Sequence, residues 1–329
     1  MMRIAILGFG SVGRGIARAL LAKDLDITVT GLADSKSGII DAGGIDLAAV
    51  LARKENGDPC GSPGVSPADV VAKADYDVLV EVTPTNVDTG EPALGHIRAA
   101  LRRHKHVVTS NKGPIALAYP ELRALAEENG VFLKYEATVC GAIPLIHAMQ
   151  EGLAGNTISR LYGVFNGTCN YILTRMAAEG LTYEQALAEA RELGYAEADP
   201  TYDVEGIDAA IKLVILANTI LDMRTALDDV ERTGITLLTP DALQLAEDQD
   251  CTIRLIGEII PEAGVLRVSP RLIAKTHPLV VEGTLNAVTV ETDLARDLTF
   301  IGKGAGSTET ASAVIGDLLY IKSRHVQGS

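Results

Sequence analysis

The sequence contains no tryptophan, and aromatic residues make up only 4% of the chain. A core built from it must therefore be aliphatic, with Val, Ile, Leu and Ala supplying the buried surface. No apolar run approaches the ~20 residues that a transmembrane helix needs, and the start "MMRIAILGFG" lacks the long apolar region of a secretion signal. These absences predict a soluble protein whose first residues already belong to the fold.

Cysteine is also scarce. The four cysteines are far apart and form no CxxC pair, which argues against a disulfide framework and against a cysteine-based zinc site. The six histidines include no HxxxH or HExxH pattern, so metal-dependent hydrolysis is not indicated either. A reducing, cytoplasmic location fits this composition best.

Basic residues are outnumbered, with 29 Lys and Arg against 43 Asp and Glu, and the formal net charge is −14. Such a surface repels phosphate backbones and anionic lipids. We therefore expect neither nucleic acid nor a membrane as a partner. The length of 329 residues is sufficient for two or three packed units, each with its own core.

A dinucleotide-binding pattern opens the chain. The apolar run "RIAIL" leads directly into "GFGSVG", and a helical pattern follows. In this GxGxxG arrangement Gly8 allows the tight turn, Gly10 lets the backbone approach a pyrophosphate, and Gly13 lets the helix pack close to the strand. We expect the whole loop to bind the cofactor: Gly8, Phe9, Gly10, Ser11, Val12 and Gly13.

The identity of the nucleotide is left open by the next strand. That strand ends in Asp34, about 20 residues after the glycine loop, where an acid favours the ribose 2′-hydroxyl of NAD. Lys36, Arg53 and Lys54 lie nearby in the sequence and could meet the 2′-phosphate of NADP, although a solvated helix end explains the last two equally well. We expect both cofactors to be accepted.

Further strands are predicted at residues 76–84, 105–113 and 131–139, with helices near 91–103 and 117–129. Strands that alternate with helices imply a parallel sheet, whose ligands lie at the carboxyl ends of the strands. Several polar residues fall at these ends: Thr83, Pro84, Thr109, Ser110, Asn111 and Lys112.

The alternation stops between about residues 136 and 150, which indicates a second, α+β domain. Two or three alternating strands are predicted within residues 278–306. A final amphipathic helix is predicted at residues 307–321, opened by a Ser/Thr cap. No linker rich in Pro or Ser separates the parts.

An unusual lysine stands in the second half. Five carboxylates precede Lys212 in "GYAEADPTYDVEGIDAAIK", and we expect a helix from near Glu205 that sets Glu205, Asp208 and Lys212 on one face. On an exposed helix, Asp208 and Lys212 would be an ordinary i,i+4 pair. Residues 209–217 contain no other charge, however, and a lysine in such a run is costly unless it is paired or functional.

A lysine in an apolar helix beside a carboxylate is suited to proton transfer. Burial lowers the pKa of a lysine and a neighbouring carboxylate raises it, so a half-buried ammonium can exchange a proton with a reacting oxygen. Oxidation of an alcohol by NAD(P)⁺ requires such a group, because the hydroxyl proton must be removed as the hydride leaves. The surrounding acids, Glu197 and Asp208 among them, predict a substrate that carries an amine, such as a small amino acid.

At this point the sequence resembles the homoserine dehydrogenases, in the short form without a C-terminal regulatory extension. The resemblance covers nearly the whole chain and rests on six segments in the same order. These segments are "GFGSVG", "TSNK", "EATVCGAIP", "GVFNGTCNYIL", "GYAEADPTYDVEGIDAAIK" and "GKGAGSTETA".

The resemblance implies NAD(P)-dependent interconversion of L-homoserine and L-aspartate 4-semialdehyde, on the path to threonine, methionine and isoleucine, by a homodimer. It assigns catalysis to Lys212 and Lys112, substrate binding to Glu197, Asp208 and Asp203, and further cofactor contacts to Thr83, Lys112, Gly194 and Gly304. The expected fold is a Rossmann-type domain at residues 1–138, an α+β substrate-binding and dimerisation domain at 139–303, and a helical segment at 304–329 that returns to the first domain.

The resemblance also implies a monovalent cation, usually Na⁺, bound by backbone carbonyls. Its ligands here would be the carbonyls of Glu136, Val139, Gly141 and Ile143, an oxygen set that suits a hard ion. Cys140 interrupts this stretch at a position where relatives often have glycine.

Two other functions remain open from the sequence. An enzyme similar to aspartate-semialdehyde dehydrogenase would use a cysteine nucleophile with a histidine base, for which Cys140 and Cys169 are the candidates. Alternatively, the chain could be a non-catalytic NAD(P)-binding regulator, although the presence of both lysines argues against it.

Overall fold

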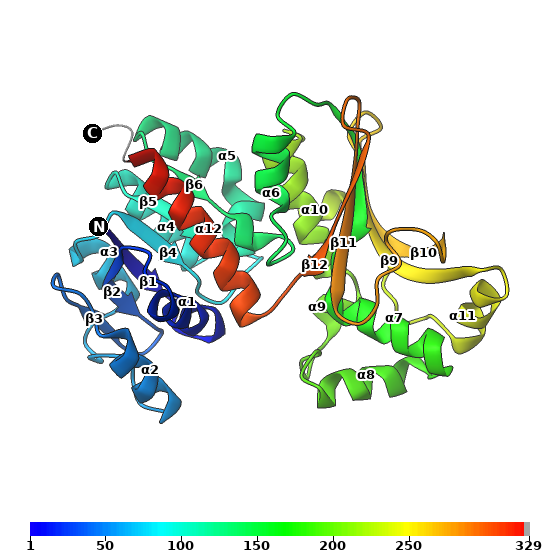
Figure 1. Cartoon of the computed structure of the whole chain (residues 1–329), viewed down its shortest axis with the longest axis horizontal. Coiled ribbons are helices and arrows are strands. Elements are labelled where there is room, and N and C mark those ends of the chain that lie inside the picture. The colour runs from blue at the N-terminus through cyan, green and yellow to red at the C-terminus, as the bar shows by residue number, and fades with distance from the viewer. Residues whose placement is uncertain (326–329) are drawn as a thin grey trace. The chain divides into compact units, whose positions relative to one another are not determined.

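The chain forms two units in the computed structural model, which describes residues 1–325. The first unit comprises Met1–Ala142 together with the chain from Gly306 on, and the second comprises Ile143–Ala305. The expected boundaries at 138 and 303 fall a few residues earlier, and the last four residues of the expected segment 304–329 lie outside the described residues. Each unit contains one six-stranded sheet (Figure 1).

The first unit has the doubly wound sheet that the sequence predicts. Its strand order is β3-β2-β1-β4-β5-β6, and all pairings are parallel except that of β2 with β3. The strands are β1 (Met2–Leu7), β2 (Ile27–Ala33), β3 (Gly38–Ile40), β4 (Val78–Glu81), β5 (His106–Thr109) and β6 (Leu133–Lys134).

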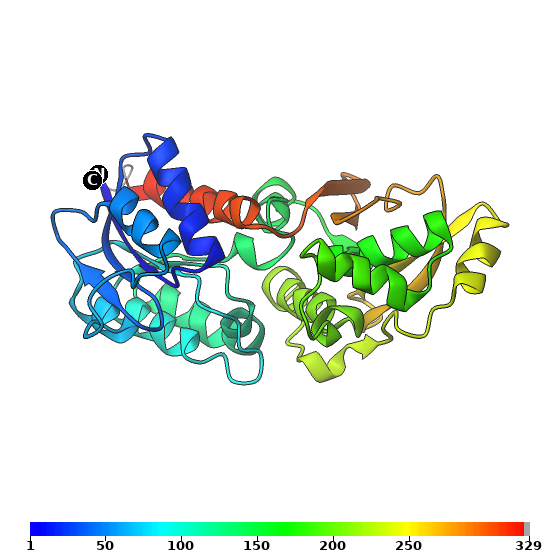
Figure 2. The ribbon, with the colours of Figure 1, turned by 90° about the horizontal axis from the view of Figure 1, so that it is seen from below.

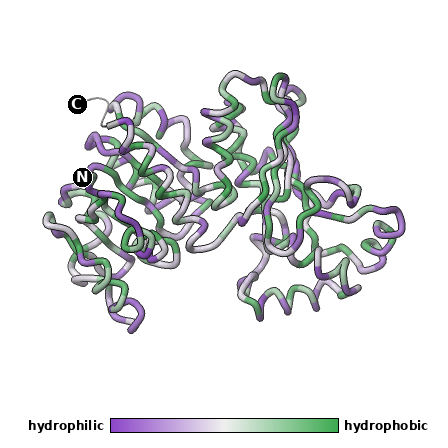
Figure 3. Tube along the Cα trace, viewed as in Figure 1, coloured by the Kyte–Doolittle hydropathy of each residue, from purple (hydrophilic) through white to green (hydrophobic). Residues whose placement is uncertain are grey.

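Helices cover both faces of this sheet. They are α1 (Ser11–Ala22), α2 (Leu47–Glu55), α3 (Pro67–Lys73), α4 (Ala93–Arg102), α5 (Lys112–Glu128) and α12 (Ser307–His325). Helices α1 and α12 pack together on one face, while α4 and α5 lie on the other (Figure 2). The core between α1, α12 and the strands is aliphatic, with Ile4, Val80 and Leu318 fully buried. In Figure 3 the hydrophobic residues accordingly follow the inner strands and helix faces.

The chain departs from expectation after β5. Residues 131–139 were expected to form a strand, but only Leu133–Lys134 pairs with β5, and the 3₁₀ turn η1 (Glu136–Thr138) follows. The backbone N–H of Glu136 donates to the Asp317 carboxylate of α12 at 3.0 Å, so this backbone is held by a helix from the far end of the chain. Ser307, the expected helix cap, donates its hydroxyl to the carbonyl of Ser11 at 2.6 Å.

The second unit is an α+β unit whose sheet has the order β12-β11-β7-β9-β10-β8. Its strands are β7 (Ile158–Val164), β8 (Glu231–Arg232), β9 (Cys251–Ile260), β10 (Val265–Ala274), β11 (Leu285–Thr292) and β12 (Asp297–Lys303). Pairing is antiparallel apart from β8 with β10. Gly257 of β9 lets Phe165 and Leu213 of α10 approach, because a Cβ there would lie 2.8 Å from Phe165 and 3.1 Å from Leu213.

The helical elements of this unit are α6 (Leu145–His147), η2 (Ala148–Gly152), α7 (Gly167–Glu179), α8 (Tyr183–Glu192), α9 (Thr201–Val204), α10 (Ile207–Ile220), η3 (Leu227–Asp229) and α11 (Pro240–Glu247). Within residues 1–325, no helix has both the length and the apolar character needed to cross a bilayer.

Candidate active site

The glycine loop joins β1 to α1, and its three glycines have different surroundings. Gly8 has a φ of +97°, and a Cβ there would lie 2.4 Å from the carbonyl oxygen of Val82. A Cβ at Gly13 would lie 2.1 Å from the carbonyl oxygen of Gly8, whereas a Cβ at Gly10 would meet no described atom within 4 Å. Gly8 and Gly13 therefore permit the internal packing, and Gly10 leaves the helix N-terminus open for an anionic ligand such as a pyrophosphate.

Asp34 directly follows β2 and is paired with Lys54 of α2. Its Oδ1 accepts hydrogen bonds from the backbone N–H groups of Lys36 and Ser37, both at 2.9 Å, and Oδ2 accepts from Lys54 Nζ at 2.9 Å. Burial raises the pKa of Asp34, but the hydrogen bonds from Lys54 and Lys36 outweigh it, so the pKa is held below its ordinary value. The acid expected at the ribose and a lysine expected near a 2′-phosphate thus form one ion pair.

The carboxyl edge of the first sheet carries Lys112. Strands β4 and β5 end at Glu81 and Thr109, and Asn111 caps α5 by accepting from the N–H of Gly113 at 3.2 Å. Lys112 is therefore the first residue of α5, whereas the sequence placed it at the end of a strand expected at residues 105–113. The order of strands reverses between β1 and β4, the point at which doubly wound sheets bind ligands.

Lys212 lies on α10 and is buried, as the sequence predicts, with 6% of its surface exposed. Its Nζ donates to Asp208 Oδ2 at 2.8 Å and to the carbonyl oxygen of Phe165 at 2.6 Å. Asp208 is itself 5% exposed. The i,i+4 pair is thus desolvated, and its two charges interact more strongly than those of an ion pair at the surface.

Two asparagines complete this cluster. Asn166 Nδ2 donates to Asp208 Oδ2 at 2.9 Å and to Asp203 Oδ1 at 2.7 Å, while its own Oδ1 caps α7. Asn286 Nδ2 donates to the Phe165 carbonyl at 3.0 Å. The structure therefore gathers Lys212, Asp208 and Asp203 around Asn166. Sequence reasoning missed both asparagines, although "FNGT" carries the signal of an Asn cap.

Other predicted residues of the second unit lie around or outside this cluster. A Cβ at Gly304 would lie 2.0 Å from Asn286 Nδ2, so Gly304 packs against the amide that shares a carbonyl with Lys212. Glu197 and Gly194 lie in the exposed loop after α8, and within residues 1–325 the side chain of Glu197 makes no hydrogen bond to the cluster.

Helix α10 begins at Ile207, close to the expected start near Glu205, but the expected position of Glu205 on its face is wrong. Glu205 belongs to the end of α9, because Gly206, with a φ of +75°, separates it from α10. Its carboxylate accepts a hydrogen bond from the Thr236 hydroxyl at 3.0 Å. Glu205 therefore does not share the helical face of Lys212.

The cysteines have the environment of structural residues. Cys169 is fully buried, its Sγ donates to the Asp203 carbonyl at 3.1 Å, and burial together with the charges of Asp203 and Asp208 raises its pKa well above the ordinary value. A thiol in this state is a poor nucleophile. Cys140 is also buried, at a φ of +58° that favours glycine. The geometry thus speaks against the cysteine-nucleophile alternative.

Comparison with known proteins identifies the family. A family model described as "Homoserine dehydrogenase" matches residues 144–319, and one described as "Homoserine dehydrogenase, NAD binding domain" matches residues 8–136. The chain belongs to the homoserine dehydrogenase family. The expected class, an NAD(P)-dependent oxidoreductase, is confirmed by these matches.

Individual relatives of this family match along their whole length. A homoserine dehydrogenase of Methanocaldococcus jannaschii is 47% identical over 97% of this chain and 98% of its own. A solved structure named as a homoserine dehydrogenase from Archaeoglobus fulgidus superimposes with a TM-score of 0.91 at 49% identity, covering 98% and 99% of the two chains. A hyperthermophilic archaeal homoserine dehydrogenase in complex with NADPH superimposes with a TM-score of 0.86 at 30% identity, covering 98% of each chain.

Proposed function

We propose that this chain catalyses the NAD(P)-dependent interconversion of L-homoserine and L-aspartate 4-semialdehyde. The observation that carries the proposal is the buried pair of Lys212 and Asp208, which supplies a proton-transfer group in a member of this family. The glycine loop of the first unit supports the cofactor requirement, and the complex of a relative with NADPH supports it independently.

In the forward direction NAD(P)⁺, when bound, supplies the hydride acceptor for the carbon that bears the hydroxyl group. Lys212 takes the hydroxyl proton as the aldehyde forms and returns it to the oxygen in reduction. Asp208 and the Phe165 carbonyl hold the lysine nitrogen in place. Asp208 and Asp203 bind the ammonium group of the amino acid, and Glu197 adds a contact from its loop. Lys112 places and polarises the substrate.

The remaining assignments concern the cofactor. We assign contacts with the nucleotide to the glycine loop, to Asp34, and to Thr83, Lys112, Gly194 and Gly304. The pathway to threonine, methionine and isoleucine follows from the reaction. A cytoplasmic location is supported by the four cysteines, which form no disulfide among the described residues.

The experiment is direct. Purified protein is supplied with L-aspartate 4-semialdehyde and either NADH or NADPH, and the loss of reduced nicotinamide absorbance is followed while homoserine is detected by chromatography. We expect stoichiometric oxidation of the cofactor and formation of homoserine. Nucleotide binding without turnover with either cofactor would instead favour the non-catalytic regulator.

The Asp34 and Lys54 pair is expected to let both cofactors bind. Replacing Asp34 by serine removes the charge that repels a 2′-phosphate, and should raise the ratio of kcat/KM for NADPH over that for NADH by about tenfold, which corresponds to ~1.4 kcal/mol. Lys54→Ala should lower the same ratio, because it leaves the carboxylate without its cation. Steady-state kinetics with both cofactors measure the effect, and a shift in the same direction in both variants would contradict this assignment.

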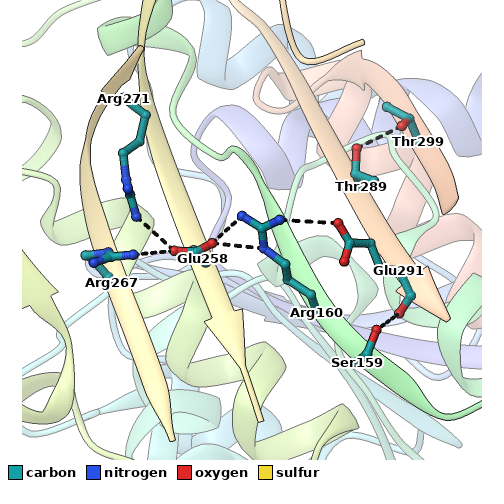
Figure 4. A network of polar contacts seen from close by, with 8 residues as sticks. All are labelled: Ser159, Arg160, Glu258, Arg267, Arg271, Thr289, Glu291 and Thr299. Atoms are coloured by element: carbon teal, nitrogen blue, oxygen red, sulfur yellow. Dashed lines mark hydrogen bonds and ion pairs between the residues drawn. The ribbon is translucent and has the colours of Figure 1, made fainter. Parts of the chain in front are cut away.

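We propose in addition that the chain works as a homodimer, through the sheet face of the second unit opposite α7 and α10. On this face Glu258 of β9 accepts hydrogen bonds from Arg160, Arg267 and Arg271, and Arg160 also pairs with Glu291 (Figure 4). A two-fold interface must be its own complement, and a face with both charge signs meets that condition.

Na⁺ is proposed as a structural ion on the carbonyls of Glu136, Val139, Gly141 and Ile143. Among the described residues no group of three or more His, Cys, Asp or Glu side chains could hold a metal, so side chains do not offer an alternative there. The carbonyls of Glu136 and Ile143 each accept one backbone hydrogen bond and, having two lone pairs, can accept a cation as well. We expect the melting temperature to rise in NaCl relative to tetramethylammonium chloride of equal ionic strength; equal melting curves would exclude the ion.

A further inference from the structure

A fully buried carboxylate lies at the carboxyl end of β4, and none of the roles above uses it. Glu81 has 0% exposure and is the last residue of the strand, level with Leu7 of β1 and with Thr109 of β5. It therefore lies where the strand order reverses and where ligands bind in this fold. His96 of α4 lies beside it, with Nδ1 at 2.8 Å from Glu81 Oε2. A buried carboxylate is unfavourable unless its oxygens are bonded, so its presence calls for a role.

The other oxygen of Glu81 is directed to the chain segment that follows the strand. Glu81 Oε1 accepts from the backbone N–H of Thr83 at 2.8 Å and also from the Thr83 hydroxyl. From the opposite side, Asn111 Nδ2 donates to the carbonyls of Thr83 at 3.1 Å and Pro84 at 3.3 Å. Residues 83 and 84 are thus held on both sides by buried groups.

This network ends at the lysine that the proposed function uses. Asn111, which bonds residues 83 and 84, is also the cap of α5, whose first residue is Lys112. Val82, between Glu81 and Thr83, has its carbonyl against Gly8 of the glycine loop, where a Cβ would approach within 2.4 Å. Glu81 therefore links three neighbouring parts of the cofactor edge, namely the glycine loop, residues 83 and 84, and the start of α5.

We propose that Glu81, held by His96, is a positioning residue for the nicotinamide end of the cofactor. The inference rests on the proposed function, since that function assigns cofactor contacts to Thr83 and Lys112. The hydrogen bonds from Thr83 to Glu81, and from Asn111 to the carbonyls of Thr83 and Pro84, fix residues 83 and 84 before the cofactor arrives. A segment that is already ordered loses less conformational freedom on binding, and the cofactor is bound more tightly.

Glu81→Gln tests this role. The glutamine retains one acceptor oxygen, for which Thr83 and His96 compete. Its amide nitrogen brings two N–H donors to a place where the neighbouring groups of Thr83 and His96 are also donors. We expect Kd and KM for NADPH to rise by about tenfold or more, the usual effect of losing a hydrogen bond to a charged group. KM for homoserine should stay within about twofold, because the substrate acids are unchanged.

Two comparisons separate positioning from general stability. His96→Gln keeps a donor for Glu81 and should bind NADPH almost as the native chain does, whereas His96→Leu lacks one and should bind it more weakly. Val80→Ala is the matched control, since Val80 lies on the same strand, is 0% exposed and packs in the aliphatic core. It should lower the melting temperature and leave Kd for NADPH unchanged.

The proposal is overturned if Glu81→Gln binds NADPH with the native Kd. It is also overturned if Val80→Ala and Glu81→Gln show the same rise in Kd for a given fall in melting temperature. Should Glu81→Gln fail to fold, the two His96 variants decide the question, and equal Kd values for them overturn it. Binding is measured by calorimetry, so a native chain that binds NADPH but does not convert homoserine would refute the proposed function and leave this test valid.

Discussion

Replacing Lys212 by alanine should reduce kcat by roughly 10²- to 10⁴-fold, the range expected when a proton-transfer group is lost. The hydroxyl proton of the substrate would then have no acceptor at the position that Asp208 and the Phe165 carbonyl define. Cofactor affinity should change little, because the glycine loop belongs to the first unit. Initial rates in both directions and calorimetric titration with NADPH measure these two quantities separately.

A matched control is available for this variant. Lys73 forms the same i,i+4 pair with Asp69 as Lys212 does with Asp208, but its side chain is 68% exposed. Lys73→Ala should leave kcat unchanged, since the pair lies at the surface. Because Lys212→Ala leaves Asp208 buried without its lysine, the melting temperature of the variant is measured as well, which separates a folding defect from a loss of proton transfer. A Lys212→Ala enzyme with near-native kcat would remove the proton-transfer role.

Replacing Glu258 by alanine should lower the melting temperature by roughly 4–8 °C and weaken the proposed homodimer. Three guanidinium groups would then face one another without their shared carboxylate. Breaking a fully buried pair costs ~3–5 kcal/mol, and we expect about 2 kcal/mol here because the arginines are about a third exposed. Light scattering should show about twice 34.6 kDa for the native chain and a smaller average mass for the variant.

The same carboxylate predicts a pH dependence. Burial raises the pKa of Glu258, but hydrogen bonds from Arg267 and Arg160 outweigh it and hold the pKa below its ordinary value of 4.5. A depressed pKa stabilises the fold above the unfolded value, and this contribution disappears as the pH falls through the folded value. The native chain should therefore have a higher melting temperature than Glu258→Ala at neutral pH, and this difference should disappear as the pH falls below about 4.5. Glu121→Ala, which removes an exposed partner of Arg98, is the control and should shift melting little.

Much of the first unit could be predicted from the sequence, because local pattern and glycine chemistry determine it. The run "RIAIL" with its glycine loop defines β1 and α1, and the acid after β2 is where the spacing places it. The strand expected at residues 131–139 is mostly absent, since Asp317 of α12 takes the N–H of Glu136. That contact joins residues 181 positions apart, and no local pattern reports it.

In the candidate site, too, contacts within one helix could be predicted from the sequence, and contacts between distant segments could not. The pairing of Asp208 with Lys212 follows from their spacing on one helix, and the absence of other charges predicted their burial. Asn286 and the Phe165 carbonyl could not be predicted, because sheet pairing between β11 and β7 brings them together. Glu205 was misplaced because the positive φ of Gly206 separates two helices that the apolar period alone would merge.

The last helix has a consequence for biosynthesis. Ala311, Val314, Leu318 and Ile321 of α12 complete the hydrophobic core that begins with Ile4 and Ile6. A nascent polypeptide emerging from the ribosome therefore exposes one side of its first sheet until α12 has been synthesised. During translation the second unit is finished earlier than the first, and a premature stop before α12 would damage the nucleotide-binding unit of the product.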